Sequence, residues 1–180
     1  MRWELIPAFL PVPISGTFPA DLMQKLAAIV SGFMPLHLSP SQTEQFQVYL
    51  NELLAWNAQT NLTGITDPDE VIVRHFADSL SCLLVIQPPY EGLRIIDVGS
   101  GAGFPGLPLR IAFPGIRLTL ADSVGKKTAF LKHLCRRLDM PDVAIVTERA
   151  ETLGANRQHR EQYDWALARA VAGMPVLAEY

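Results

Sequence analysis

The 180-residue sequence lacks several features that would assign it to a specialised class of protein. No apolar run approaches the roughly 18 residues that a membrane-spanning helix needs, and there is no internal repeat or low-complexity tract. The two cysteines and four histidines are scattered without the spacing of metal ligands, so we predict no metal site. We therefore expect a cytoplasmic globular protein with no membrane and no metal partner.

Cysteine is scarce, and both thiols, Cys82 and Cys135, fall on apolar faces of segments with helical spacing. This placement favours buried, reduced thiols over a disulfide. Hydrophobic residues make up 49% of the chain and charged residues 18%, a composition typical of a globular protein. At this length we expect one sizeable domain with a small helical addition.

The apolar start of the chain is not a convincing signal sequence. Glu4 and three prolines interrupt residues 1–16, and no small-residue cleavage pattern follows. We interpret residues 1–20 as an irregular extension.

Basic residues are scarce in the first half of the chain. Residues 1–93 hold 3 Lys/Arg against 9 Asp/Glu, whereas residues 94–180 hold 12 against 9. Residues 123–138 carry five basic side chains and no acidic one, and such a local surface can bind phosphates although the net charge is −3. A solvated helix face is the alternative. The candidates for phosphate contact are Lys126, Lys127, Lys132, Arg136 and Arg137.

Helical patterns dominate residues 21–91. A capping box at Ser39–Gln42 and a similar cap at Asp67 each precede an apolar stripe with helical spacing. We predict three helices, at about 22–33, 40–56 and 67–86, with a polar turn between the second and third. Together they form a predicted N-terminal helical cap over residues 21–91.

From residue 92 onward, short apolar runs alternate with helical patterns. Strands are predicted at 93–98, 117–122, 143–149 and 164–170, with helices at 105–113, 125–138 and within 149–160. This alternation implies parallel strands joined by crossover helices, hence an open α/β sheet. Ligands bind such sheets beyond the carboxyl ends of the strands, so residues 92–180 form the predicted ligand-binding domain.

The segment DVGSGAGFPG, residues 97–106, follows the first predicted strand directly. A GxGxxG pattern runs from Gly101 to Gly106 and would suggest a dinucleotide, with its pyrophosphate at the next helix N-terminus. That pattern begins four residues after Asp97, near the end of the strand, and contains Phe104 and Pro105. The tight turn would therefore come late for a dinucleotide site.

A second pattern in the same segment begins with Asp97, followed by Gly99, Gly101 and Gly103. An anionic Asp97 would repel a pyrophosphate, but it suits a ligand that carries an ammonium group, such as S-adenosylmethionine. Asp122, at the end of the second strand, is placed for ribose hydroxyl groups in either case. A purely structural glycine turn with solvated acids is the third alternative.

Several motifs then occur in a fixed order: WNAQTNLTGI, RHFADSL, IIDVGSGAGFPGLPL, LADSVGKKTAFL, ERAETL and ARAVA. Together they resemble the RsmG (GidB) family, bacterial methyltransferases that place a methyl group on N7 of a guanine in 16S ribosomal RNA. The resemblance covers about residues 40–178. It implies a Rossmann-like methyltransferase fold, S-adenosylmethionine as the cofactor, and 16S rRNA or the small ribosomal subunit as the partner of a monomer.

The resemblance also implies roles for single residues. It places Gly99, Phe104, Ala150, Glu151 and Arg169 in the cofactor pocket, together with the pattern residues Asp97, Gly101 and Asp122. His75 matches a family motif with Arg74 and Asp78 and is our substrate-side candidate, although a structural histidine is the simpler interpretation.

No catalytic acid or base is predicted. Guanine N7 has a lone pair and no proton, so catalysis would rest on aligning N7, methyl and sulfur and on excluding water. The motif [DNS]PP[YFW], which exocyclic-amine methylation would require after the fourth strand, is absent there. Its near match QPPY at 87–90 precedes the first strand and is interpreted as a linker.

The chain ends at Tyr180, where the family fold continues into further strands. We therefore expect a Rossmann-like domain whose C-terminal strands are missing. Two alternatives follow: a cofactor-binding module made inactive by that truncation, and an NAD-dependent oxidoreductase, which only the GxGxxG pattern favours.

Overall fold

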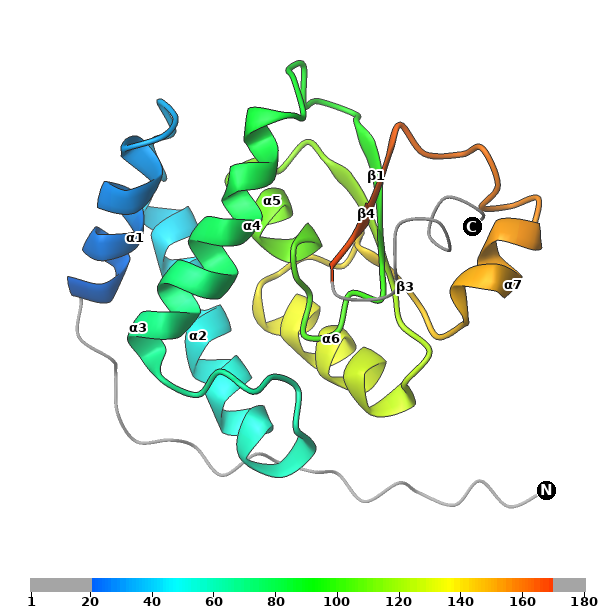
Figure 1. Cartoon of the computed structure of the whole chain (residues 1–180), viewed down its shortest axis with the longest axis horizontal. Helices are drawn as coiled ribbons and strands as arrows, with labels where there is room; N and C mark the ends of the chain where they lie inside the picture. The colour runs from blue at the N-terminus through cyan, green and yellow to red at the C-terminus, as the bar shows by residue number, and fades with distance from the viewer. Residues whose placement is uncertain (1–20, 170–180) are drawn as a thin grey trace.

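The computed structural model describes residues 21–169 (Figure 1), so the predicted extension 1–20 and the chain after Arg169 lie outside the described residues. A first group of helical elements comprises α1 (Asp21–Ser31), α2 (Pro40–Thr60), α3 (Pro68–Val71), a π-helical turn (Ile72–Ala77), α4 (Asp78–Ser81) and a 3₁₀ turn (Cys82–Leu84). The α/β part that follows comprises β1 (Arg94–Val98), α5 (Gly106–Ala112), β2 (Arg117–Ala121), α6 (Gly125–Arg137), β3 (Ala144–Val146), α7 (Ala150–Ala155) and β4 (Trp165–Ala168).

The predicted capping box starts α2. The Ser39 hydroxyl accepts the Gln42 N–H at 3.2 Å, and the Gln42 side chain accepts the Ser39 N–H at 2.7 Å. The helix continues to Thr60, beyond the predicted end at residue 56, because the stop is Asn61, which adopts a left-handed conformation (φ 49°). The prediction erred by treating the polar residues of the last turn as loop.

The third predicted helix is also present, and its hydrogen-bond pattern changes along its length. Asp67 caps its first turn by accepting the Glu70 N–H at 3.0 Å. The helix then passes through the π-helical turn Ile72–Ala77 and ends in the 3₁₀ turn, two residues before the predicted end at 86. Such π-helical turns are frequent at functional sites, and this one contains His75.

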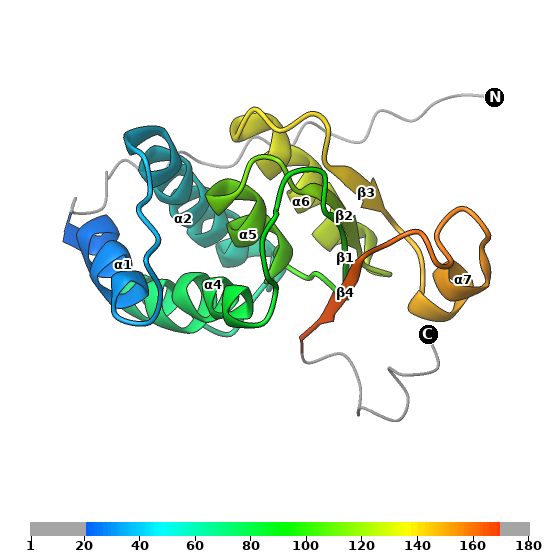
Figure 2. The same cartoon turned by 90° about the horizontal axis from the view of Figure 1, so that it is seen from above.

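The four strands form one parallel sheet in the order β3-β2-β1-β4. All four were predicted, and β3 and β4 are shorter than predicted because a strand extends only as far as its neighbour pairs with it. β3 pairs with residues 119–121 of β2 alone. Figure 2 shows that α5 and α6 cover one face of the sheet and α7 the other.

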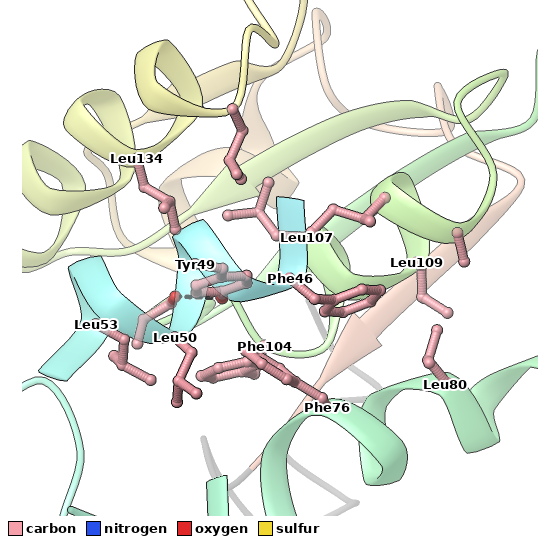
Figure 3. Packing of buried hydrophobic residues seen from close by; sticks show 14 of the residues in the cluster. Phe46, Tyr49, Leu50, Leu53, Phe76, Leu80, Phe104, Leu107, Leu109 and Leu134 are labelled. Carbon is pink, nitrogen blue, oxygen red and sulfur yellow. Dashed lines mark hydrogen bonds between the residues drawn. The ribbon is translucent and has the colours of Figure 1, made fainter. Parts of the chain in front are cut away.

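A single large hydrophobic cluster joins the N-terminal helices to the covered face of the sheet. Figure 3 shows its centre, to which α2, the third predicted helix, the glycine-rich loop, α5 and α6 all contribute, through Phe46, Tyr49, Leu50, Leu53, Phe76, Leu80, Phe104, Leu107, Leu109 and Leu134. Within the part of the chain that the structure describes, the face under α7 carries a small cluster of Ile96, Ala121 and Leu153. The helical cap therefore packs directly on the elements that position the site.

The two cysteines are free thiols, with Cys135 buried and Cys82 partly buried. Between Asp21 and Arg169, no helix is both long and apolar enough to cross a membrane.

Candidate functional site

The sheet order places a candidate site at the carboxyl ends of β1 and β4. From β1 the chain moves outward to β2 and β3, and it then returns to the opposite side of β1 to form β4. The point where strand order reverses is where open α/β sheets bind ligands. The residues that leave the two strands at this point are Gly99 after β1 and Arg169 after β4.

The glycine-rich loop after β1 turns sharply toward β2. The N–H groups of Gly99 and Ser100 both donate to the carbonyl oxygen of Ala121, at 2.8 and 3.0 Å. Gly101 and Gly103 have φ values of +59° and +101°, which side chains with a Cβ rarely adopt. The loop is thus held against the end of β2, with its backbone close to the point where a ligand would lie.

Asp97, the last residue but one of β1, is fully buried beneath this loop. One carboxylate oxygen, Oδ2, accepts the Gly106 N–H at 2.8 Å, and the other, Oδ1, is buried with no hydrogen-bond partner among residues 21–169. Burial raises the pKa of Asp97 to about 7, although the Gly106 N–H and the positive charge of Arg169 act in the opposite direction. An unpartnered buried acceptor of this kind suits a ligand group that carries hydrogen-bond donors and positive charge.

The same hydrogen bond bears on the GxGxxG interpretation. A dinucleotide site needs the helix N-terminus after the loop to face a pyrophosphate. Here Asp97 accepts an N–H group from the first residue of that helix, α5. The anion-binding end of α5 therefore faces a carboxylate, which argues against a pyrophosphate there.

Asp122 lies just after β2 and is 5% exposed. It accepts the Gly101 N–H at 2.9 Å and the Val124 N–H at 2.8 Å, and Lys127 Nζ lies 3.8 Å from its carboxylate. Two backbone hydrogen bonds leave acceptor capacity on a carboxylate, which has about four acceptor positions. Asp122 thus fixes the loop and can still accept hydroxyl groups.

Phe104 is placed inside the protein rather than on an open surface. It is 4% exposed, and its ring stacks between Tyr49 at 5.2 Å and His75 at 4.5 Å. Tyr49, which the sequence indicates only as a core residue, also donates a hydrogen bond of 2.6 Å to the Ala102 carbonyl oxygen. The aromatic stack therefore fixes the loop to the helical cap, while a contact of Phe104 with the cofactor stays a prediction.

Arg169 connects the end of β4 with the π-helical turn. Its guanidinium donates to Asp78 Oδ2 at 2.9 Å, to the Arg74 carbonyl oxygen at 3.2 Å and to His75 Nδ1 at 3.1 Å. It also lies 5.3 Å from the centre of the Phe104 ring. The motif residues Arg74, His75 and Asp78 thus meet the arginine that follows β4.

His75 is held neutral in this network. Because Arg169 donates to Nδ1, the ring proton is on Nε2, which donates to the Thr63 hydroxyl at 2.8 Å. Burial and the charge of Arg169 lower the pKa of His75 to about 4. Thr63 itself was missed by sequence reasoning, because a threonine in a polar turn carries no signal that it contacts a histidine twelve residues later.

Two further predicted cofactor residues lie at the start of α7. Ala150 is partly buried and Glu151 is exposed, and both follow β3, which is separated from β1 by β2. They share the carboxyl edge of the sheet with the glycine-rich loop. Their part in binding stays a prediction.

The predicted phosphate contacts lie along α6, and the structure separates them into two groups. Lys126, Lys132 and Arg136 are exposed. Arg137 is exposed as well, but it donates to Glu52 at 2.8 Å, and the partly buried Lys127 lies 3.8 Å from the carboxylate of Asp122. Three basic side chains are therefore the better candidates for phosphate contact. Across the described part of the chain, no three His, Cys, Asp or Glu residues gather where they could hold a metal ion.

Comparisons with known proteins agree on one family. Residues 42–180 match the GidB family model, described as rRNA small subunit methyltransferase G. The ribosomal RNA small subunit methyltransferase G of Roseiflexus castenholzii is 54% identical over 145 residues, which are 81% of this chain and 61% of that protein. Its counterpart from Alkaliphilus metalliredigens is 50% identical over 144 residues, 80% of this chain and 60% of that protein. The chain thus spans about three fifths of the length of these relatives.

A solved structure shows the same fold. It is a putative protein-L-isoaspartate O-methyltransferase from Plasmodium falciparum in complex with S-adenosyl-L-homocysteine, with a TM-score of 0.50 and 16% identity. The match covers 83% of this chain and 72% of that one. The parallel sheet with helices on both faces is therefore a Rossmann-like methyltransferase fold, as predicted.

Proposed function

Because the chain belongs to the rRNA small subunit methyltransferase G (GidB) family, we propose that it transfers a methyl group from S-adenosylmethionine to N7 of a guanine in 16S ribosomal RNA. The observation that carries the proposal is the buried, unpartnered Oδ1 of Asp97 beneath a glycine-rich loop at the strand-order switch. We propose the small ribosomal subunit in the cytoplasm as the place of action, and a monomer as the active form.

The residues at the carboxyl edge fit this cofactor. Asp97 supplies an acceptor for the ammonium group, and Asp122 one for the ribose hydroxyl groups. Gly99 and Gly101 allow close backbone approach. Arg169 would supply a planar fork for the carboxylate, and we propose that Ala150 and Glu151, at the start of α7, read the adenine edge.

The proposed mechanism relies on positioning. S-adenosylmethionine supplies an electrophilic methyl group on a sulfonium, and guanine N7 needs no deprotonation before it attacks. The chain's own residues therefore bind and orient the two reactants and exclude water from them. The stack of Tyr49, Phe104 and His75 holds the loop rigid, and the hydrogen bonds of Arg169 fix the end of β4 relative to the cap.

Calorimetric titration of the chain tests the cofactor. We expect S-adenosylhomocysteine to bind with a micromolar Kd and NAD to show no heat of binding at the same concentrations, because Asp97 occupies the α5 N-terminus. Methyl incorporation into small-subunit particles that lack the modification then tests catalysis. Binding of NAD alone would contradict the proposal and favour an oxidoreductase, while cofactor binding without methyl transfer would favour a binding module.

Binding to ribosomal RNA should depend strongly on salt if α6 contacts phosphates. Replacing Lys126, Lys132 and Arg136 with glutamine is expected to weaken binding and to reduce the slope of log K against log salt by about 2 to 3, since each phosphate contact contributes about 0.7 to 0.9. Fluorescence anisotropy with a labelled 16S rRNA fragment measures this slope. Lys25→Gln, on α1, is the control. An unchanged slope in the triple variant would exclude this face of α6.

A further inference from the structure

Thr63, in the segment between α2 and α3, lies at the far end of the hydrogen-bond network of Arg169. Its hydroxyl oxygen is 2.8 Å from Nε2 of His75, and His75 Nδ1 accepts a hydrogen bond of 3.1 Å from the Arg169 guanidinium. These residues come from a connecting segment, from the π-helical turn and from the end of β4. One imidazole ring therefore connects Thr63 to the arginine at the carboxyl edge of the sheet.

The Thr63 hydroxyl acts as an acceptor toward His75. Since Arg169 donates to Nδ1, the imidazole proton is on Nε2, and the Nε2–H group donates to Thr63. The same hydroxyl oxygen accepts the Ile65 N–H at 3.1 Å, so both of its lone pairs are used. A side chain without an acceptor at position 63 would deprive the Nε2–H group of its partner, and His75 is only 8% exposed.

Thr63 is itself held in one position. The Asn57 side chain accepts the N–H groups of Leu62 and Thr63 at 2.6 and 2.9 Å and donates to the Thr63 carbonyl oxygen at 2.9 Å. Asn57 is 8% exposed, so these hydrogen bonds are shielded from water. The acceptor for His75 is therefore preorganised rather than formed on binding.

The His75 ring is fixed by stacking and by hydrogen bonds. It stacks on the Phe104 ring, with centroids 4.5 Å apart and planes at 17°. Stacking restrains the plane of a ring more than its orientation within that plane. The hydrogen bond from Nε2–H to Thr63 restrains that orientation as well, and it thereby sets the direction in which Nδ1 faces Arg169.

Arg169 keeps donors for a ligand after these contacts. Its guanidinium has five N–H groups, and the hydrogen bonds to Asp78, to the Arg74 carbonyl oxygen and to His75 use three of them. The Asp78 side chain is 54% exposed, and exposed ion pairs hold a geometry weakly, so His75 provides the shielded contact. With respect to residues 21–169, two N–H groups remain, which is the number that a bidentate carboxylate accepts.

We propose that Thr63 is a positioning residue, which acts through His75 to orient the remaining N–H groups of Arg169 toward the carboxylate of the cofactor. The inference rests on the proposed function, and it assigns a determinant of cofactor affinity to the helical cap. Without the Thr63 hydroxyl, the His75 ring can turn toward another partner, and Arg169 loses its shielded contact. Affinity for the carboxylate then falls, while the ammonium, ribose and adenine contacts are unaffected.

Calorimetric titration with two ligands separates this role from a structural one. S-adenosylhomocysteine has an ammonium group and a carboxylate, whereas S-adenosyl-3-thiopropylamine keeps the ammonium group and lacks the carboxylate. Thr63→Val keeps the branched shape and removes the hydroxyl. We expect it to raise the Kd for S-adenosylhomocysteine about fivefold, the effect of one lost hydrogen bond, and to change the Kd for the thiopropylamine less than about twofold. Unchanged binding of the thiopropylamine also shows that the variant is folded.

Three further variants complete the experiment. Thr63→Ser restores the hydroxyl and should restore both Kd values. Thr66→Val removes an exposed hydroxyl from the same segment and should leave both Kd values unchanged. His75→Phe keeps a ring beside Phe104 and removes both nitrogens. In that background Thr63→Val should have no further effect, because the connection to Arg169 is already lost.

The outcomes for this inference and for the proposed function are separable. If Thr63→Val weakens both ligands by the same factor, or weakens neither, the inference is overturned and the proposed function stands. The same holds if the unaltered chain binds the two ligands equally, or if the effect of Thr63→Val persists in His75→Phe. If the unaltered chain binds neither ligand, the proposed function is contradicted, and the inference is overturned with it.

Discussion

Replacing Gly103 with alanine is expected to destabilise the chain by about 3 to 5 kcal/mol, which is the sum of a backbone cost and a steric cost. Its φ of +101° is a conformation that residues with a side chain rarely adopt. A Cβ there would lie 2.6 Å from the Tyr49 hydroxyl and 2.7 Å from Leu107 Cδ1. Both neighbours are fully buried, and the Tyr49 hydroxyl is held by its hydrogen bond to the Ala102 carbonyl oxygen, so neither can move cheaply.

Gly101→Ala provides the matched control for this prediction. Gly101 also has positive φ, +59°, but a Cβ there meets only the Gly99 carbonyl oxygen, at 3.9 Å. Gly101→Ala should therefore lower the free energy of unfolding by about 1 to 2 kcal/mol, which is the cost of the backbone strain alone. Urea unfolding followed by circular dichroism compares the two. A similar loss of unfolding free energy in both variants would show that the close contacts around Gly103 do not contribute. If they do contribute, adding Tyr49→Phe to Gly103→Ala should recover part of the loss, because it removes the hydroxyl that the new Cβ meets.

The elements of this fold were predictable because their signals are local. Ser39–Gln42 forms its capping box within four residues, and the apolar runs of β1 and β2 are bounded by glycine and proline. The glycine-rich loop was placed correctly because the residues that require its turn adjoin the strand that it follows. Local chemistry of this kind does not depend on knowing the tertiary partner.

Other features depend on partners distant in the sequence. The π-helical turn at Ile72–Ala77 leaves the apolar stripe of its helix nearly unchanged, so periodicity could not reveal it. The contact of Arg169 with His75 joins residues 94 positions apart, and no spacing rule relates them. Similarly, the resemblance marks Phe104, but nothing in the sequence indicates that Tyr49 and His75 enclose its ring.

In the candidate site, too, some features have local sequence signals and others depend on distant partners. Asp97 was selected for its place before Gly99, and the structure adds that it also accepts the first N–H of α5. That second contact could not be predicted, because it depends on how far the loop carries the chain before the helix begins. Asp97 therefore closes the end of α5 with one carboxylate oxygen and leaves the other available as an acceptor for a ligand.

Replacing Asp97 with asparagine is expected to stabilise the chain at pH 8 by about 2 kcal/mol and to weaken cofactor binding. The pKa of Asp97 is about 7 in the folded chain, against an ordinary value of 3.8. The folded state therefore holds this proton more tightly, so its contribution to stability is full below about pH 4 and is lost as the pH rises to about 7. At 1.36 kcal/mol for each unit of pKa, the loss is at most about 4 kcal/mol.

Asparagine removes this loss and keeps the geometry. Its side-chain oxygen can accept the Gly106 N–H as Asp97 Oδ2 does, while its unpartnered amide hydrogens cost about 1 to 3 kcal/mol. The stabilisation relative to the unaltered chain should thus grow between pH 5 and pH 8. His75, whose pKa is lowered to about 4, loses its stabilising effect as the pH falls from 6.5 toward 4, but it is present in both chains and cancels in the difference.

Urea unfolding at several pH values tests the first half of this prediction, with the exposed Asp139→Asn as the control for losing one surface carboxylate. A pH-independent difference between Asp97→Asn and the unaltered chain would show that the buried carboxyl does not titrate near neutrality. Calorimetry with S-adenosylhomocysteine tests the second half. Affinity for the unaltered chain should rise from pH 6 to pH 8, as Asp97 becomes the anion that attracts the ammonium group, and Asp97→Asn should abolish this rise.

The two halves of the prediction follow from one physical cause. An ionised carboxylate without a partner is costly inside the protein, and the same missing partner is what a cationic ligand supplies. If Asp97→Asn is more stable at pH 8 and binds the cofactor at least tenfold more weakly there, Asp97 contributes to cofactor binding and lowers the stability of the fold. If it gains stability with no loss of affinity, Asp97 serves only to close the N-terminus of α5, and the ammonium group must be bound elsewhere.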